Sequence, residues 1–293
     1  MNNNEPITDV KTLGAGKTII LGLQHTFAMF GATVLVPILT GLPIATTLLM
    51  AGAGTLLFHL LTKGKVPAFL GSSFAFLGGY AAVAPLMEDG TPNIEMLPYA
   101  CGGVFCAGLL YLLLSALIKG FGAKRVMRFF PPVVTGPIII SIGLILAPSA
   151  INNCATNWPI ALIALATVIV FNIWGRGMAK IVPILIGVAV SYLAAILMGE
   201  VDFSGIQDEA IVGLPEITLM KFDVSAIITI MPIALATMME HIGDISAIGA
   251  TTGKNYIADP GLHRTLLGDG LATCLAAAVG APANTTYGEN TGV

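Results

Sequence analysis

Long stretches without a charged side chain dominate the chain. They run over residues 18–62, 66–87, 96–118, 129–175, 181–199, 224–239 and 270–288. A helix needs about 20 apolar residues to cross the hydrocarbon core of a bilayer, so the two longest stretches must each hold two spans. Gly41-Leu42-Pro43 divides the first stretch, and a neutral polar loop at 148–159 divides the second.

A further, less apolar span is predicted from about residue 262 to 280, and another begins near Pro282. The pattern therefore predicts an all-α polytopic membrane protein with nine spans and the start of a tenth. The tenth is unusual, because residues 282–292 are rich in Thr, Tyr, Asn and Gly and form a poor helix. Such a segment suits a short extended stretch that leads into a half-helix, which is tolerated at membrane depth only where it lines a cavity.

The composition agrees with a chain whose solvent is largely lipid. Hydrophobic residues make up 56% and charged residues only 10%, whereas soluble domains carry about 25% charge. These values exclude a soluble globular fold and a disordered chain. The net charge of −3 leaves no basic excess for nucleic acid. The four cysteines lack the spacing of a disulfide framework or a zinc site, so neither metal nor cofactor is expected.

The loop charges separate by sign when the spans are numbered in order. One face receives 12 of the 13 basic residues, and the other receives acids with Lys221 as its single basic residue. Since basic loops stay on the cytoplasmic side, the sequence predicts a multi-pass protein of the cell membrane with a cytoplasmic N-terminus. Residues 1–16 would form a retained cytoplasmic tail.

Three acids remain inside predicted spans, where each charge costs several kcal/mol, about 2.5 to 3.5 on insertion scales. They are Glu240, Asp244 and Glu289. Glu240 and Asp244 are four residues apart and share a helix face, with His241 beside them. The alternative is that each acid lies at the end of its span, in the interface.

A weak internal repeat links the two halves of this pattern. Gln24-His25 resembles Glu240-His241 at an offset of 216, and Ser72-Ser73-Phe74-Ala75 resembles Thr285-Thr286-Tyr287-Gly288 at an offset of 213. Each match joins spans seven apart. Because seven is odd, the second copy enters the membrane from the opposite face, and the repeat of about 215 residues is inverted. A complete protein of this design would need about 430 residues.

Two discontinuous segments that meet near the midplane would form a site for a small planar molecule. Phe74 and Tyr287 would be its flat walls, with core packing or lipid contact as the alternative role. Glu240 and Glu289 would accept hydrogen bonds from N–H groups, and half-helix amides would donate to C=O groups. Nucleobases have this alternating pattern. Carboxylates in a dry cavity can also take up protons near neutral pH, which offers a route for proton coupling.

Five segments in order resemble the nucleobase-ascorbate transporter family, from about Gly16 to the end of the chain. They are residues 24–32, 71–75, Phe130-Pro131-Pro132-Val133-Val134-Thr135-Gly136-Pro137, Glu240-His241-Ile242-Gly243-Asp244 and residues 287–292. The resemblance implies fourteen spans in two inverted repeats of seven, with a short strand in each of spans 3 and 10. It implies a core domain at 17–120 and 224–293, a gate domain at 121–198 and an acidic outer loop at 199–223.

The resemblance also implies proton-coupled uptake of uracil, with uracil, protons and the lipid bilayer as partners and a homodimer as a possible assembly. The implied substrate-binding residues are Ala32, Phe74, Glu240, Tyr287, Gly288 and Glu289. Proton coupling would involve Glu289, Asp244 and Glu240, with His25 and His241 in support.

Rival functions remain open at this stage. A xanthine or urate permease of the same family is the nearest, although those members usually carry Gln at the position of Glu289. An anion transporter of the same architecture is disfavoured by two carboxylates. A membrane enzyme lacks a nucleophile–base pair or a phosphate loop. The family signature of span 10 stops at Val293, before its Thr, and spans 11–14 lie beyond it, so we expect residues 1–293 alone not to transport.

Overall fold

The computed structural model describes residues 14–87, 89–126, 128, 132–176, 179, 183–204 and 213–292. The chain divides into two compact units, which are treated separately below. The first unit comprises Met1–Gly31, Leu146–Leu214 and Gly292–Val293, and the second comprises Ala32–Ile145 and Pro215–Thr291.

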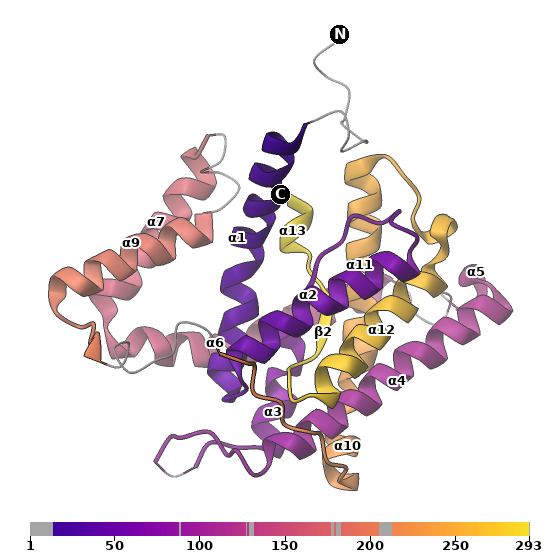
Figure 1. The fold of residues 1–293 in the computed structure, drawn as a ribbon, viewed down its shortest axis with the longest axis horizontal. Helices are drawn as coiled ribbons and strands as arrows, with labels where there is room; N and C mark the ends of the chain where they lie inside the picture. The colour runs from indigo at the N-terminus through magenta and orange to yellow at the C-terminus, as the bar shows by residue number, and fades with distance from the viewer. Residues whose placement is uncertain are drawn as a thin grey trace. The chain divides into compact units, whose positions relative to one another are not determined.

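Helices make up most of the described chain (Figure 1). Their bounds are α1 Ala15–Thr40, α2 Ile44–Leu61, α3 Leu77–Val83, α4 Leu97–Phe121, α5 Ala123–Val126, α6 Pro132–Thr156, α7 Trp158–Trp174, α9 Pro183–Met198, α10 Val224–Ile230, α11 Ile233–Thr252, α12 Leu262–Ala278 and α13 Glu289–Gly292. A short 3₁₀-helix, η2, spans Phe74–Phe76, and a short π-helix, η5, spans Ile257–Gly261. The strands are β1 Leu70–Ser72 and β2 Asn284–Thr286.

Apolar helices long enough to cross a membrane are present in the described residues. By length and composition there are four, at Leu21–Thr40, Ile44–Leu61, Leu97–Phe121 and Val224–Thr252. Shorter apolar helices lie at Phe74–Val83, Trp158–Trp174 and Ile186–Met198. The helical membrane architecture is therefore confirmed, whereas the count of nine spans stays a prediction.

Local turn chemistry explains several boundaries. Gly41 has a φ of +81° between α1 and α2, where the sequence placed a division. The predicted loop at 148–159 is wrong, because α6 continues through Thr156. Only Asn157 interrupts the helix, and its side chain accepts a hydrogen bond from Ile160 N at 3.3 Å to cap α7. A single capping residue suffices to end one helix and start the next.

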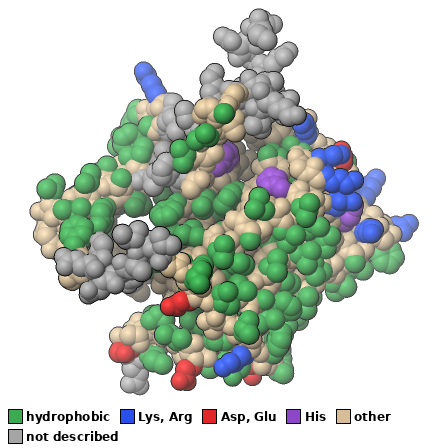
Figure 2. Space-filling model, viewed as in Figure 1, with side chains coloured by type: hydrophobic (Ala, Val, Ile, Leu, Met, Phe, Trp, Pro, Cys, Tyr) green, Lys and Arg blue, Asp and Glu red, His purple; other side chains and the backbone are tan. Residues whose placement is uncertain are grey.

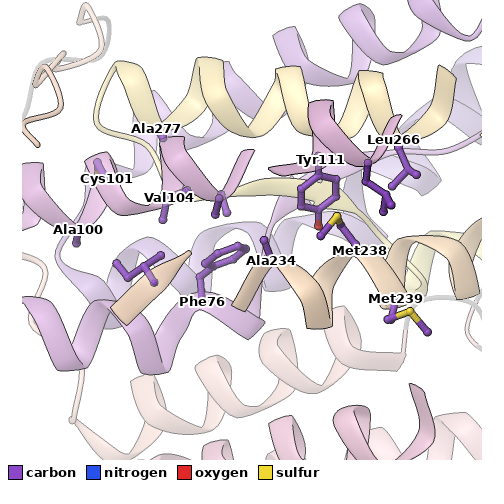
Figure 3. Packing of buried hydrophobic residues seen from close by; sticks show 14 of the residues in the cluster. Phe76, Ala100, Cys101, Val104, Tyr111, Ala234, Met238, Met239, Leu266 and Ala277 are labelled. Atoms are coloured by element: carbon purple, nitrogen blue, oxygen red, sulfur yellow. The ribbon is translucent and has the colours of Figure 1, made fainter. Parts of the chain in front are cut away.

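The core of the second unit forms where α4 and α12 approach closely. A Cβ on Gly108 of α4 would lie 2.6 Å from Cys274 Sγ and 3.0 Å from Gly270 O of α12. Small residues at this crossing let the two backbones pack together. Phe76, Val104, Tyr111, Met238 and Leu266 fill the adjoining core from four different elements (Figure 3).

Much of the molecule's face is apolar, as lipid contact requires. Figure 2 shows hydrophobic side chains spread over the helices, with Lys and Arg toward the end of the second unit that carries α5. Acids lie toward the opposite end, which holds α10 and the loop between α3 and α4. The exposed leucines Leu109, Leu113 and Leu117 follow one side of α4 at helical spacing.

Candidate functional site

The site is built on a pair of short strands from distant parts of the chain. β1 and β2 pair antiparallel, with Leu70 opposite Thr286, Gly71 opposite Thr285 and Ser72 opposite Asn284. Backbone hydrogen bonds extend the pair at both ends, from Tyr287 N to Phe69 O at 3.0 Å and from Ser73 N to Ala283 O at 2.9 Å. Both strands are buried, and each leads into a short helical segment. The extended segments thus lie where the sequence placed them.

The outer edge of each strand is satisfied by a helix side chain. Thr55 Oγ1 of α2 accepts from Leu70 N at 3.0 Å and donates to Leu70 O at 3.2 Å. Asp269 Oδ1 of α12 accepts from Thr286 N at 3.0 Å. A two-stranded sheet with no further strands on its edges needs such partners when it is buried.

A buried polar network connects β2 to α11 and α12. Thr286 Oγ1 donates to Asp244 Oδ2 at 3.1 Å, so its oxygen is left to accept from His241 Nδ1, also at 3.1 Å. His241 Nδ1 lies 3.2 Å from Asp269 Oδ2, and both side chains are fully buried. Asp269 Oδ1 accepts from the strand amide, whereas its Oδ2 has the imidazole nitrogen as a close neighbour but no hydrogen-bond partner among the described residues.

Tyr287 anchors the end of β2 to α1 and β1. Its hydroxyl accepts from Thr33 Oγ1 at 3.1 Å and donates to Ser72 O at 2.9 Å. Its ring fills the space beside Gly71, where a Cβ would lie 2.6 Å from the ring. The side chain is only 5% exposed.

The structure brings most of the predicted site residues to this strand pair. Glu240 and Asp244 lie one turn apart in α11, which packs against β2 and against η2, where Phe74 begins. Both acids are partly exposed and lie within the apolar segment Val224–Thr252. Their position at membrane depth stays a prediction.

The remaining predicted residues divide into placed and unplaced. Ala32 O lies 3.3 Å from Ser72 Oγ, which puts this part of α1 beside β1. Gly288 is exposed, and a Cβ on it would lie 3.0 Å from Asp244 Oδ1. Glu289 begins α13, but its side chain lies outside the described residues. His25 belongs to the first unit, and its position relative to the strands is not defined.

Sequence reasoning missed Asp269. It was treated as the border of the charge-free stretch 270–288, although it lies inside the predicted span 262–280. That position was itself a signal, because an acid within a span is retained only where it has a role. Among the described residues, no group of three or more His, Cys, Asp and Glu is arranged to hold a metal ion.

Comparison with known proteins identifies the family. Residues 16–293 match the model of the Permease family. The chain belongs to this family, the nucleobase-ascorbate transporters. The expectations of a transporter rather than an enzyme, and of an integral membrane protein, are therefore confirmed.

Named relatives align with nearly the whole chain. A probable uracil permease of Haemophilus influenzae is 42% identical, over 100% of this chain and 71% of its own length. The uracil permease of Bacillus caldolyticus is 41% identical, over 99% and 69%. The transmembrane domain of the cyanobacterial bicarbonate transporter BicA has the same fold, with a TM-score of 0.62 and 18% identity over 92% of this chain and 75% of that one. At that identity the likeness concerns the fold alone.

Proposed function

We propose that this permease takes up uracil across the cytoplasmic membrane together with a proton. The observation that carries the proposal is the position of two carboxylates, Glu240 and Asp244, on the part of α11 that passes the buried strand pair. Uracil presents N–H donors and C=O acceptors around a flat ring. Carboxylates match the donors, and backbone amides at strand and helix ends match the acceptors. The printed names of the relatives support uracil as the base.

Each predicted site residue has a proposed role. Glu240 accepts from the N–H groups of the base, and the rings of Phe74 and Tyr287 flank it. Ala32 and Gly288 leave room at the pocket wall, because neither carries a bulky side chain. Glu289 contacts the base from the start of α13, and His25 supports that segment.

The proton would balance charge in the loaded site. An uncompensated carboxylate at membrane depth is costly, so neutralising one lowers the cost of moving the occupied site. We assign this role to Asp244, Glu240 and Glu289. Thr286 Oγ1 of β2 donates to Asp244 Oδ2 at 3.1 Å. Protonation of Asp244 would therefore change this hydrogen bond to the strand that precedes Gly288.

We further propose that two inverted repeats of seven spans build this site. A constant offset of 214 relates matching contacts in the two halves. The bond from Ser73 N to Ala283 O becomes the bond from Tyr287 N to Phe69 O, and Gly71 pairs with Thr285, its own equivalent. This is the relation that a two-fold axis through the strand pair requires.

The helices beside the strands follow the same offset. A Cβ on Gly54 of α2 would lie 3.0 Å from Ala272 Cβ, and a Cβ on Gly268 of α12 would lie 2.8 Å from the ring of Phe58. Gly268 and Ala272 are 214 residues after Gly54 and Phe58. With this repeat the two offsets taken from the sequence, 216 and 213, are both replaced by 214, and Gly288 rather than Tyr287 corresponds to Phe74.

The domain division is also a proposal. Residues 17–120 and 224–293 would form the core that carries substrate, residues 121–198 the gate, and residues 199–223 an outer acidic loop. Support comes from the second compact unit, which gathers most of the proposed core, and from α7 and α9 of the proposed gate, which pack on each other in the first unit.

The test is ligand-induced stabilisation of the purified protein by uracil, xanthine and hypoxanthine, measured in parallel at pH 6 and pH 8. A ligand that binds only the native state raises the melting temperature by mass action. We expect a shift with uracil alone, lost in Glu240→Gln and kept in the control Glu95→Gln, whose side chain is exposed in an outer loop. A shift with a purine, or none with any base, contradicts the proposal.

Proton coupling is tested in vesicles that contain the full-length transporter. Uracil uptake should be driven by an inward pH gradient and abolished by a proton ionophore, and it should carry protons inward without other ions. Uptake at the same rate with and without the pH gradient would contradict proton coupling, but it would not contradict the proposal that uracil is the substrate.

A further inference from the structure

The hydroxyl of Tyr287 has a separate role from the ring that carries it. It is the meeting point of three elements, since Thr33 lies in α1, Ser72 ends β1 and Tyr287 follows β2. The inference below rests on the proposed function, because it concerns how the substrate site is held.

Hydrogen bonds link this hydroxyl to Thr33 and Ser72. Thr33 Oγ1 donates to it at 3.1 Å, and it donates to Ser72 O at 2.9 Å. Ser72 Oγ in turn donates to Thr33 O at 3.0 Å and lies 3.3 Å from the tyrosine oxygen. The single phenolic proton is thus used on a backbone carbonyl of β1.

The surrounding space is matched to this arrangement. Gly71 lies under the ring, where a Cβ would be 2.6 Å from Cζ and 2.8 Å from Thr33 Oγ1. Any side chain there would push the ring away from Ser72 and Thr33. Tyr287 N also bonds Phe69 O at 3.0 Å, so one residue closes the strand pair through both backbone and side chain.

The clasp has no symmetric copy at its equivalent position. The offset of 214 places Ser73 where the second half has Tyr287. Ser73 shares the backbone bond, to Ala283 O at 2.9 Å, but it has no phenol ring with which to repeat the contacts of Tyr287. The tie between halves is therefore made from one side.

We propose that the Tyr287 hydroxyl is a positioning group that clasps α1, β1 and β2 together and so fixes the substrate-facing ends of both strands. In this proposal the base contacts the ring of Tyr287, while the hydroxyl bonds only to groups of the protein and does not bind the substrate. Loss of the hydroxyl should weaken binding of every base alike, without altering which base is preferred.

The test compares Tyr287→Phe, Thr33→Val and the double variant in the full chain. Tyr111→Phe is the matched control, since it removes the same atom from a buried tyrosine of α4. Removing one hydrogen bond weakens an equilibrium by roughly fivefold. We expect the uracil Kd to rise about fivefold in Thr33→Val, which removes one of these bonds, and at least as much in Tyr287→Phe, which also removes the bond to Ser72 O. The double variant should match Tyr287→Phe, because loss of the phenol already removes its bond to Thr33. Maximal uptake should stay within about twofold, and the ratio of uracil to thymine affinity should not change.

A second readout does not depend on substrate. Amide hydrogen exchange at residues 69–73 and 283–287 should be faster in Tyr287→Phe and Thr33→Val, and unchanged in Tyr111→Phe. If the wild type binds no uracil, the proposed function fails, and this exchange still decides on the clasp. Unchanged exchange overturns the clasp. So does a change in base preference in Tyr287→Phe that Thr33→Val does not share, since that result would make the hydroxyl a substrate ligand.

Discussion

At the scale of single residues, Thr55 and Asp269 do the same work with different chemistry. Each supports the outer edge of one strand from a helix, and each lies 214 residues from the other. The hydroxyl of Thr55 also donates to Ala51 O of its own helix at 2.8 Å, whereas the second carboxyl oxygen of Asp269 lies 3.2 Å from His241 Nδ1. The second half of the site therefore has a buried carboxyl group where the first half has a hydroxyl, and such a group is costly to bury without partners.

We predict that Asp269→Asn lowers stability and uracil affinity together. The amide oxygen can still accept from Thr286 N, but an amide then replaces the carboxyl oxygen beside His241, at a cost of about 1–3 kcal/mol. Thermal unfolding and uracil binding would be compared with Asp89→Asn, an exposed loop acid. A variant as stable as the control would show that the Asp269 charge has no structural role.

A second prediction at this scale concerns Gly71. The Gly71→Ala methyl would meet the Tyr287 ring at 2.6 Å and Thr33 Oγ1 at 2.8 Å, so we expect a loss of about 1–3 kcal/mol in unfolding free energy. Gly52→Ala in α2 is the matched control, because nothing lies within 4 Å of its Cβ. Helix propensity makes that control neutral or stabilising by about 1 kcal/mol. Equal melting temperatures for the two variants contradict this account.

At the scale of elements, the strands are held by helices that cross closely at glycines. α12 packs against both α2 and α4 (Figure 1), and each crossing places a glycine from both helices at the contact. In lipid, helix association depends on such close packing, because lipid tails are as apolar as the side chains they would replace. The position of the strand pair therefore depends on the α2–α12 and α4–α12 contacts.

We therefore predict that Gly108→Ala destabilises the protein although it improves helix propensity. Its Cβ would lie 2.6 Å from Cys274 Sγ and 3.0 Å from Gly270 O, which forces α4 from α12 at a cost of about 1–3 kcal/mol. Gly120→Ala, on the same helix with nothing within 4 Å, should be harmless. The pair is compared by thermal unfolding in one detergent, and a stabilised Gly108→Ala would refute the tight crossing.

At the scale of the whole molecule, charged side chains gather toward the ends of the second unit rather than around its strand pair. Basic residues lie toward the end that carries α5, and acids lie toward the end that holds α10 and the loop between α3 and α4 (Figure 2). Hydrogen bonds from Thr91 lower the pKa of Asp89 in that loop, and in the first unit hydrogen bonds from Ser204 lower the pKa of Asp202. A depressed pKa keeps an exposed carboxylate charged when the medium around it becomes mildly acidic.

The orientation prediction follows from that distribution. In a variant whose four native cysteines are replaced by Ala, a membrane-impermeant maleimide added to intact cells should label Asp89→Cys and Asp202→Cys. Lys65→Cys and Lys124→Cys should react only after the cells are opened. The reverse pattern would place the N-terminus outside.

Hydrophobic periodicity, turn residues and isolated acids are local properties, so they can be read along the chain. They sufficed for the turn at Gly41, the extended segment near residue 285 and the shared face of Glu240 and Asp244, whereas the strand near residue 70 was expected only from the family resemblance. Only the tertiary structure revealed three other features, namely the break between α10 and α11 at Met231-Pro232, the helix over residues 148–156 and the contact of Asp269 with β2. Each depends on which distant groups satisfy a buried polar atom or fill a gap. Those partners lie more than 200 residues apart in the case of Gly71 and Thr285, and only packing brings them together.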